Sequence, residues 1–249
     1  MVSPNPDANN GAAEKNADSP TTSTLPDAII RLAGNSQDGI QTIGGFLAKL
    51  AGRSDQEVIT YMTIPSTISG GPSIFQVRMG TGEVLSVGDQ TDFLVAFYQH
   101  SYEEHIDSLR EGGVLIYDSD HVEPDTSDRR FLYVPVAITS NTIEVMGGSA
   151  KNKGKNMFVL GLISRVFSLD VLKLQTLVRE RFAGKGEDVA RNALLALDAG
   201  YATPVENLLG HSYSFGKSER TSDKPQVTMD GNTALTYGLL AAGVRYGAG

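Results

Sequence analysis

The segment Ile64–Gly80, with the sequence IPSTISGGPSIFQVRMG, joins two strand-forming runs through an unusually elaborate connection. Pro65 biases the residue before it toward extended geometry. Gly70 and Gly71 permit a positive φ or the close approach of another backbone. The alternation over 74–79 is typical of a β-strand. The pattern is compatible with a long hairpin-like loop and with a surface that contacts a cofactor or a partner, and both interpretations stay open.

The second interpretation depends on the polar groups of this loop. Ligands of α/β proteins gather at the carboxyl ends of the strands, where such a loop can lie. The hydroxyl groups available there are those of Ser66, Thr67, Ser69 and Ser73. Together with Pro65, Gly70 and Gly71, these residues are predicted to line a cofactor or partner site.

Strand-like and helix-like runs alternate on both sides of this segment. The strand-like runs are 28–34, 58–64, 74–79, 92–97, 114–119 and 130–138. The helix-like runs are 40–52, 101–113, 156–167, 169–182 and 187–201. This order predicts an α/β fold with three α/β/α layers and a mostly parallel, Rossmann-like sheet.

The composition changes at both ends of this α/β unit. Residues 1–24 are polar and rich in Asn, Ser and Thr, which predicts a disordered tail. We expect the α/β domain to cover 25–203 and a linker to cover 204–230, where Ser, Lys, Gly and Pro dominate. A new helix rich in small residues is expected within 231–249.

The charge and the cysteine count narrow the function classes. The net charge of −8 argues against a primary role in nucleic-acid binding, which needs clustered basic residues. The chain has no cysteine, so any iron–sulfur cluster must be ligated by another polypeptide segment. This fits a reducing, cytoplasmic compartment, and no apolar run reaches the roughly 18 residues of a membrane span. We interpret Lys151, Lys153 and Lys155 as a solvated loop rather than a phosphate contact.

The turn Gly34–Gly39, GNSQDG, lies between the first predicted strand and the first predicted helix. Such a turn can present backbone N–H groups to an anion, which makes Gly34, Ser36 and Gly39 candidate cofactor-binding residues. However, Ser36 stands where a dinucleotide fingerprint has its middle glycine, and the second strand carries no acid for a ribose. The alternative is a tight turn in which Ser36 or Asp38 caps the helix.

The titratable residues give no catalytic or metal-binding constellation. His100 and His105 are five residues apart rather than four, which predicts a solvated helix face instead of a metal site. Asp118 ends a buried strand and Asp120 follows it. A carboxylate there can bind a ligand hydroxyl, but capping the turn is the favoured interpretation.

The order of several motifs resembles one enzyme family. The motifs are AGNSQDGIQTIGGFLAKLAG, TIPSTISGGPSIFQVRMG, GDQTDFLVAF, EGGVLIYDS, NMFVLGLISRVF and RNALLALDAGY. In this order they are similar to the gamma domain of 2-oxoacid:ferredoxin oxidoreductases. The resemblance is strongest to the N-terminal part of the fused alpha subunit of the 2-oxoglutarate enzymes, and it covers about 28–201. The turn Gly34–Gly39 departs from the family, because many relatives carry more glycine there.

The resemblance implies a function and a set of partners. Thiamine diphosphate, Mg²⁺, a [4Fe–4S] cluster and coenzyme A would serve oxidative decarboxylation of a 2-oxoacid to an acyl-CoA, with electrons passing to ferredoxin. None of these cofactors is expected to be bound wholly by this chain. The implied partners are the remainder of the alpha subunit, a cysteine-containing beta subunit and ferredoxin. The resemblance also places Pro65–Ser73 toward the thiamine site.

The resemblance makes 231–249 the start of the thiamine pyrimidine-binding alpha domain. In the family, a Tyr-Pro-Ile-Thr-Pro run follows a segment like AGVRYGAG. We therefore expect a split gene, a cleaved subunit or a truncated subunit. Two rival interpretations stay open: an NAD(P)-binding Rossmann oxidoreductase and a non-catalytic assembly module.

Overall fold

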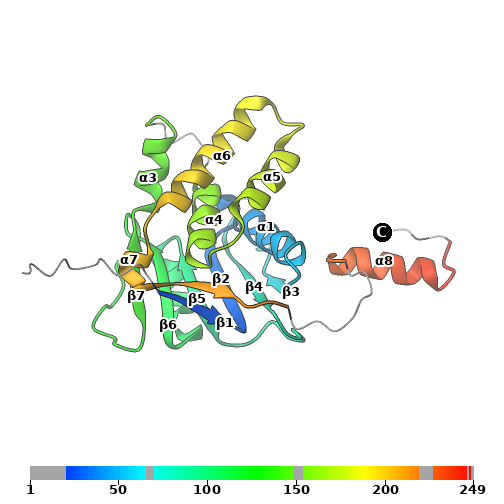
Figure 1. Cartoon of the computed structure of the whole chain (residues 1–249), viewed down its shortest axis with the longest axis horizontal. Coiled ribbons are helices and arrows are strands. Elements are labelled where there is room, and N and C mark those ends of the chain that lie inside the picture. Colours follow the sequence, from blue (N-terminus) through cyan, green and yellow to red (C-terminus); the bar gives the residue numbers. More distant parts are fainter. Residues whose placement is uncertain (1–20, 66–69, 149–153, 219–226, 246, 248–249) are drawn as a thin grey trace, which may run out of the picture.

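The chain forms a six-stranded sheet in the order β3-β4-β2-β5-β6-β7 (Figure 1). The computed structural model describes residues 21–65, 70–148, 154–218, 227–245 and 247. The strands are β2 (Asp27–Asn35), β3 (Glu57–Met62), β4 (Pro72–Gly80), β5 (Thr91–Ala96), β6 (Leu109–Asp118) and β7 (Leu132–Val136). Pro135 lies in β7, the edge strand, where its missing N–H costs no ladder hydrogen bond.

The sheet is mixed, with three parallel and two antiparallel pairings. β2, β5, β6 and β7 pair in parallel, as predicted for most of the sheet. β4 runs antiparallel to both β2 and β3, so β3 and β4 form a hairpin. In this register Asn35, the last residue of β2, faces Pro72, the first residue of β4. The loop of the hairpin therefore lies at the edge where the parallel strands end.

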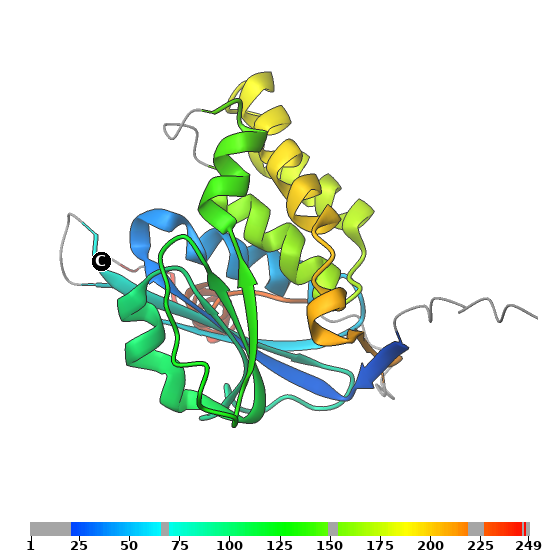
Figure 2. The ribbon, with the colours of Figure 1, turned by 90° about the vertical axis from the view of Figure 1, so that its left-hand side faces the viewer.

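Most of the helices cover one face of the sheet (Figure 2). The helices on this side are α1 (Ile40–Gly52), α3 (Ile138–Val145), α4 (Lys155–Val166), α5 (Val171–Phe182) and α6 (Glu187–Ala202). α1 follows its sequence pattern, because Ile43, Leu47 and Leu50 are buried on its inner side. A Cβ at Gly44 would meet the Phe75 ring at 2.1 Å, so this glycine permits close helix–sheet packing.

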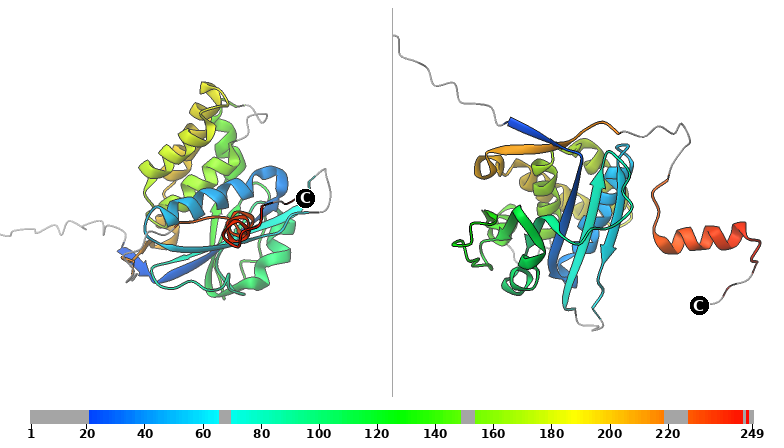
Figure 3. Two further views of the ribbon diagram at one scale, coloured as in Figure 1. Left: turned by 90° about the vertical axis from the view of Figure 1, so that its right-hand side faces the viewer. Right: turned by 90° about the horizontal axis from the view of Figure 1, so that it is seen from below.

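The second face has a smaller helical cover. Only α2 (Gln99–His105) and a 3₁₀ turn (Ile106–Ser108) lie over it among the described elements, as the view from below shows (Figure 3). A second apolar cluster forms there around Leu94, Leu115 and Phe131. The α/β class with helices on both faces is thus confirmed, with unequal layers.

Two boundaries differ from the sequence prediction. The helix expected over 101–113 ends at His105, and β6 already begins at Leu109. Gly112 has a φ of +76°, and the pairing of β6 with β5 shifts its register in this part of the strand. The pair Gly112–Gly113 therefore marks an irregularity within β6 rather than a helix stop. The helix α3 follows β7 directly and was not predicted, because its sequence ITSNTIEV is rich in β-branched residues.

The predicted tail and linker contain further elements. β1 (Thr21–Leu25) pairs in parallel with β8 (His211–Phe215), and α7 (Glu206–Leu209) precedes β8. Tyr213 packs edge-on against Phe93 with ring centroids 5.0 Å apart, which joins β8 to the core. Residues 206–215 are thus part of the folded unit, although a linker was predicted there. The proposed domain boundaries otherwise stay predictions.

The last described helix is α8 (Gly231–Ala241), at the position where a new helix was predicted. None of its residues is buried. Within the described part of the chain, no helix has the length and apolar character needed to cross a bilayer.

Candidate functional site

Two loops meet at the edge of the sheet where the parallel strands end. The first is the turn after β2, in which Ser36, Gln37 and Asp38 form a 3₁₀ turn. The second is the β3–β4 hairpin loop. The Ser36 N–H donates to the Gly71 carbonyl at 3.0 Å, which fastens one loop to the other. The structure therefore brings together two groups of residues that the sequence predicted as separate candidates.

Close packing explains the glycines of both loops. A Cβ at Gly34 would meet the Phe97 ring at 2.5 Å, and one at Gly39 would meet the Asn156 side chain at 2.5 Å. Gly39 and Gly70 also have φ values of +74° and +87°, which favour glycine. These contacts within the chain account for the three glycines without a ligand.

The hydroxyl of Ser73 serves the hairpin. Ser73 is 3% exposed, and its Oγ donates to the Thr63 carbonyl at 2.7 Å. Thr63 in turn accepts the Ile74 N–H at 3.0 Å through its own Oγ1. Pro65, two residues after Thr63, is half-buried. The predicted contact residues Ser66, Thr67 and Ser69 lie outside the described residues, so a ligand role for this loop stays a prediction.

Asp38 links the first turn to the end of β5. Its carboxylate accepts the Asn35 N–H at 2.9 Å and the Tyr98 hydroxyl at 2.9 Å. Asp38 therefore closes the 3₁₀ turn rather than capping α1, whose N-cap is Gly39 with no side-chain hydrogen bond. Burial, together with the hydrogen bond to Asp38, raises the pKa of the Tyr98 hydroxyl well above its usual range. Tyr98 is thus a neutral donor at physiological pH.

Asp118 is the best-buried carboxylate of this edge. It is fully buried at the end of β6, and its Oδ2 accepts the Thr139 hydroxyl at 2.6 Å. Its Oδ1 accepts the N–H groups of Asp120 and Thr139, each at 3.3 Å. The favoured interpretation of Asp118 as a turn cap is consistent with these bonds, which tie the β6 end to the start of α3.

Lys155 forms an ion pair with Asp118 and also contacts Tyr98, the hydrogen-bond partner of Asp38. Its Nζ lies 3.2 Å from Asp118 Oδ2 and 5.0 Å from the centre of the Tyr98 ring, a cation–π distance. Only 17% of the Lys155 side chain is exposed. The prediction of a solvated lysine loop is therefore wrong for Lys155, while Lys151 and Lys153 lie outside the described residues.

The neighbouring histidines are half-buried, which corrects the prediction of a solvated face. His100 stacks on Tyr98 with ring centroids 5.5 Å apart. The pKa of His105 is lowered by burial and, to a smaller extent, by the positive charge of Arg31.

Asp120 holds the start of α3, because its carboxylate accepts the N–H and the hydroxyl of Ser140 at 2.7 and 2.9 Å. Burial opposes ionisation of Asp120, but these bonds outweigh it and lower its pKa.

The edge network connects β2, β5, β6, α3 and α4 through Asp38, Tyr98, Lys155, Asp118 and Thr139. Each carboxylate in it is already engaged by donors of this chain. Such a network of hydrogen bonds and an ion pair fixes the loops in place. Sequence reasoning missed Tyr98 and Thr139, because a tyrosine after a strand and a threonine early in a helix have no distinctive spacing.

Comparisons with known proteins identify the family. The model of the family described as "Pyruvate ferredoxin/flavodoxin oxidoreductase" matches residues 29–203. The chain is 31% identical to the 2-oxoglutarate oxidoreductase subunit KorA of Mycobacterium tuberculosis. This match covers 90% of the chain and 38% of that subunit.

Solved structures agree with this result. The 2-oxoglutarate:ferredoxin oxidoreductase of Magnetococcus marinus, solved with 2-oxoglutarate, coenzyme A and succinyl-CoA bound, has a TM-score of 0.76 and 30% identity. The match covers 88% of this chain and 38% of that one, so the chain spans well under half of both relatives. The gamma subunit of a keto/oxoacid ferredoxin oxidoreductase from Geobacter sulfurreducens shares the fold, with a TM-score of 0.58 and coverage of 99% of that chain. The chain therefore belongs to the pyruvate ferredoxin/flavodoxin oxidoreductase family.

Proposed function

We propose that the chain is the gamma-domain portion of a 2-oxoacid:ferredoxin oxidoreductase that acts on 2-oxoglutarate. The observation that carries this proposal is the similarity to a 2-oxoglutarate oxidoreductase subunit over 90% of the chain. The match extends beyond an isolated α/β domain, because it covers more residues than 29–203. The reaction proposed is oxidative decarboxylation of the 2-oxoacid to an acyl-CoA, with electrons passing to ferredoxin in the cytoplasm.

We propose that the chemistry takes place on an assembly with other polypeptide segments. The remainder of an alpha subunit and a cysteine-containing beta subunit would supply the thiamine site and the iron–sulfur cluster, since this chain has no cysteine. When bound, thiamine diphosphate with Mg²⁺ supplies the carbanion chemistry that decarboxylation needs. The exposed apolar side chains of α8, such as Leu235 and Leu240, support a docking role for that helix.

The role proposed for this chain is to support the thiamine site with the hairpin loop. The described residues do not form a complete cofactor cradle, because the Ser36 N–H and the Ser73 hydroxyl are both engaged within the chain. These bonds instead fix the described ends of the hairpin loop, near Thr63 and Gly71, at the sheet edge. The edge network would keep these ends of the hairpin in position while a neighbouring segment binds the cofactor.

The NAD(P)-binding alternative has less support. In a dinucleotide-binding fold the strand after the first helix lies beside the first strand and carries the ribose-binding acid. Here β4 separates β3 from β2, and the N–H of Ser36 is directed to Gly71. A titration with NADH that gave saturable binding would restore this alternative.

A reconstitution assay tests the proposal. The co-purified complex is supplied with 2-oxoglutarate, pyruvate or 2-oxoisovalerate, and reduction of a viologen dye is followed with and without coenzyme A. We expect reduction to require 2-oxoglutarate and coenzyme A, and we expect the isolated chain to be inactive. Preference for another 2-oxoacid would overturn the substrate, and turnover by the isolated chain would overturn the proposed role.

A further inference from the structure

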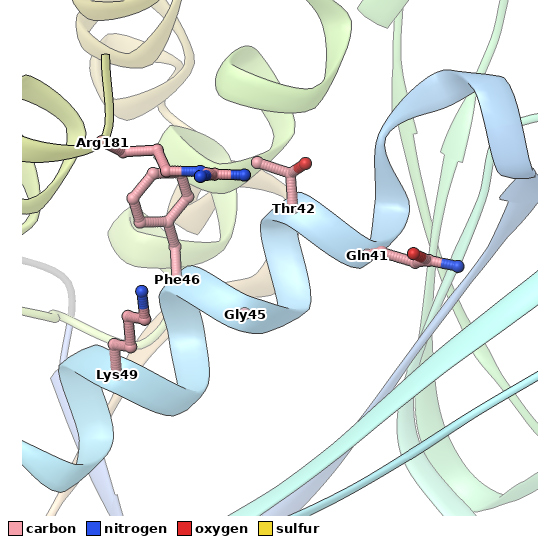
Figure 4. A pocket seen from close by; sticks show the side chains of 6 residues that line it. All are labelled: Gln41, Thr42, Gly45, Phe46, Lys49 and Arg181. Atoms are coloured by element: carbon pink, nitrogen blue, oxygen red, sulfur yellow. The ribbon is translucent and has the colours of Figure 1, made fainter. Parts of the chain in front are cut away.

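A surface recess lies between α1 and α5, on the side of α1 that faces away from the sheet (Figure 4). It holds about 400 Å³ and is lined by Gln41, Thr42, Gly45, Phe46, Lys49 and Arg181. Phe46 is 5% exposed, so its ring forms a fixed wall. The volume falls within the range of small-molecule sites, which is about 300–1,000 Å³.

The charge of this recess is opposite to that of the whole chain. It contains two cationic side chains and no carboxylate, whereas the chain carries a net charge of −8. Among the ion pairs of the described residues, none includes Lys49 or Arg181. The neighbouring Glu180 is paired with Arg53 at 3.4 Å instead. The two cations therefore lack a counter-charge from the described part of the protein.

The backbone of α1 leaves open space beside Lys49. Gln41, Gly45 and Lys49 are spaced by four residues and so follow one stripe of the helix. A Cβ placed on Gly45 would meet no atom within 4 Å, so the middle of the stripe is open. Arg181 reaches from α5 toward Thr42, and the Lys49 amine is directed to the Phe46 side, whereas Gln41 points away (Figure 4).

We propose that this recess binds a phosphoryl group of a small anionic molecule. Arg181 and Lys49 supply the positive charge of the site. An arginine fork and a lysine point charge are the side chains that proteins use most for phosphoryl oxygens. The Phe46 wall and the notch at Gly45 leave space for the remainder of the ligand. This site does not depend on the proposed function.

Titration of the whole chain with inorganic diphosphate at low ionic strength tests the proposal, with calorimetry and amide chemical shifts as readouts. We expect saturable binding with shifts at Thr42 and Gly45. Arg181→Gln and Lys49→Gln should each weaken binding roughly tenfold, the effect of about 1.4 kcal/mol from one charged hydrogen bond. Arg191→Gln removes the same charge from an exposed ion pair on α6 and should leave binding unchanged.

A second pair of variants separates the recess from the general charge of the surface. Gly45→Ala should fold and bind like the wild type, because its new methyl group has open space. Gly45→Glu places a carboxylate in the recess, one helical turn from Lys49, and should abolish binding while the protein stays folded. An absence of saturable binding would overturn the proposal, as would equal binding by Gly45→Glu and Gly45→Ala. Citrate in place of diphosphate serves as a second arm, and stronger binding of citrate would replace the phosphoryl group by a carboxylate.

Discussion

Substituting Lys155 by Met should destabilise the protein far more than a comparable substitution at the surface. The change keeps the apolar stem of the side chain but removes the only cation paired with Asp118 among the described residues, and Asp118 is fully buried. Breaking a buried ion pair costs about 3–5 kcal/mol. The hydroxyl and N–H of Thr139 still solvate the carboxylate, and Lys155 is 17% exposed. We therefore expect a loss of about 2–3 kcal/mol, at or just below the lower limit of this range.

Denaturant unfolding of the whole chain, followed by far-ultraviolet circular dichroism, measures this loss. In the double variant Asp118→Asn/Lys155→Met the buried charge is gone, and the amide oxygen can still accept from Thr139. The double variant should therefore be more stable than Lys155→Met by about 1 kcal/mol. Together with the single variant Asp118→Asn it completes a cycle, in which contacting residues couple by about 0.5–3 kcal/mol. Lys173→Met removes an exposed ion pair with Asp170, so this matched control should cost less than about 0.5 kcal/mol. Equal losses for Lys155→Met and Lys173→Met, or additive effects in the cycle, would refute the edge network as described.

Three further outcomes are expected. Gly161→Ala should lower the free energy of unfolding by about 2 kcal/mol, because the new Cβ would lie 2.0 Å from the Leu197 carbonyl oxygen. Gly45→Ala should instead raise it, by at most about 1 kcal/mol, because the new methyl group has open space. Equal effects of the two variants in thermal melts would contradict this packing. Burial lowers the pKa of His105 from 6.5, so the unfolded chain takes up this proton at a higher pH than the folded chain. The free energy of unfolding should therefore fall as the pH drops below 6.5 toward the folded pKa. His105→Gln should reduce this pH dependence, and an unchanged slope would count against burial of His105. Gly70→Ala, at a φ of +87°, should lower the turnover of the assembled enzyme without preventing assembly, and normal turnover would argue against a role for the hairpin loop.

The sequence predicted the elements whose hydrophobic periodicity is strong. α1 and the buried strands β2 and β5 follow patterns that need no tertiary information. α3 was missed because β-branched residues dominate it, and its start depends on Asp118, a residue distant in sequence. β1 and β8 were missed because each is short and polar, and they gain a partner only when the two ends of the domain meet.

The candidate site was predictable in position but not in detail. The turn after β2 and the hairpin loop were both expected at the carboxyl edge, where ligands of α/β proteins bind. Their connection through Ser36 and Gly71 required the antiparallel register of β4. The pairing of Lys155 with Asp118 joins residues 37 positions apart and has no sequence signature. A lysine in a polar segment is usually solvated, so only the folded structure reveals its buried partner.

Native mass spectrometry of the complex purified through this chain tests the central claim most directly. We predict a hetero-oligomer that contains this chain, a cysteine-containing subunit with an iron–sulfur cluster, and bound thiamine diphosphate. Removing this chain from the complex should abolish reduction of the dye in the presence of 2-oxoglutarate and coenzyme A. A purified species that contains only this chain, or a complex that keeps full activity without it, would contradict the account.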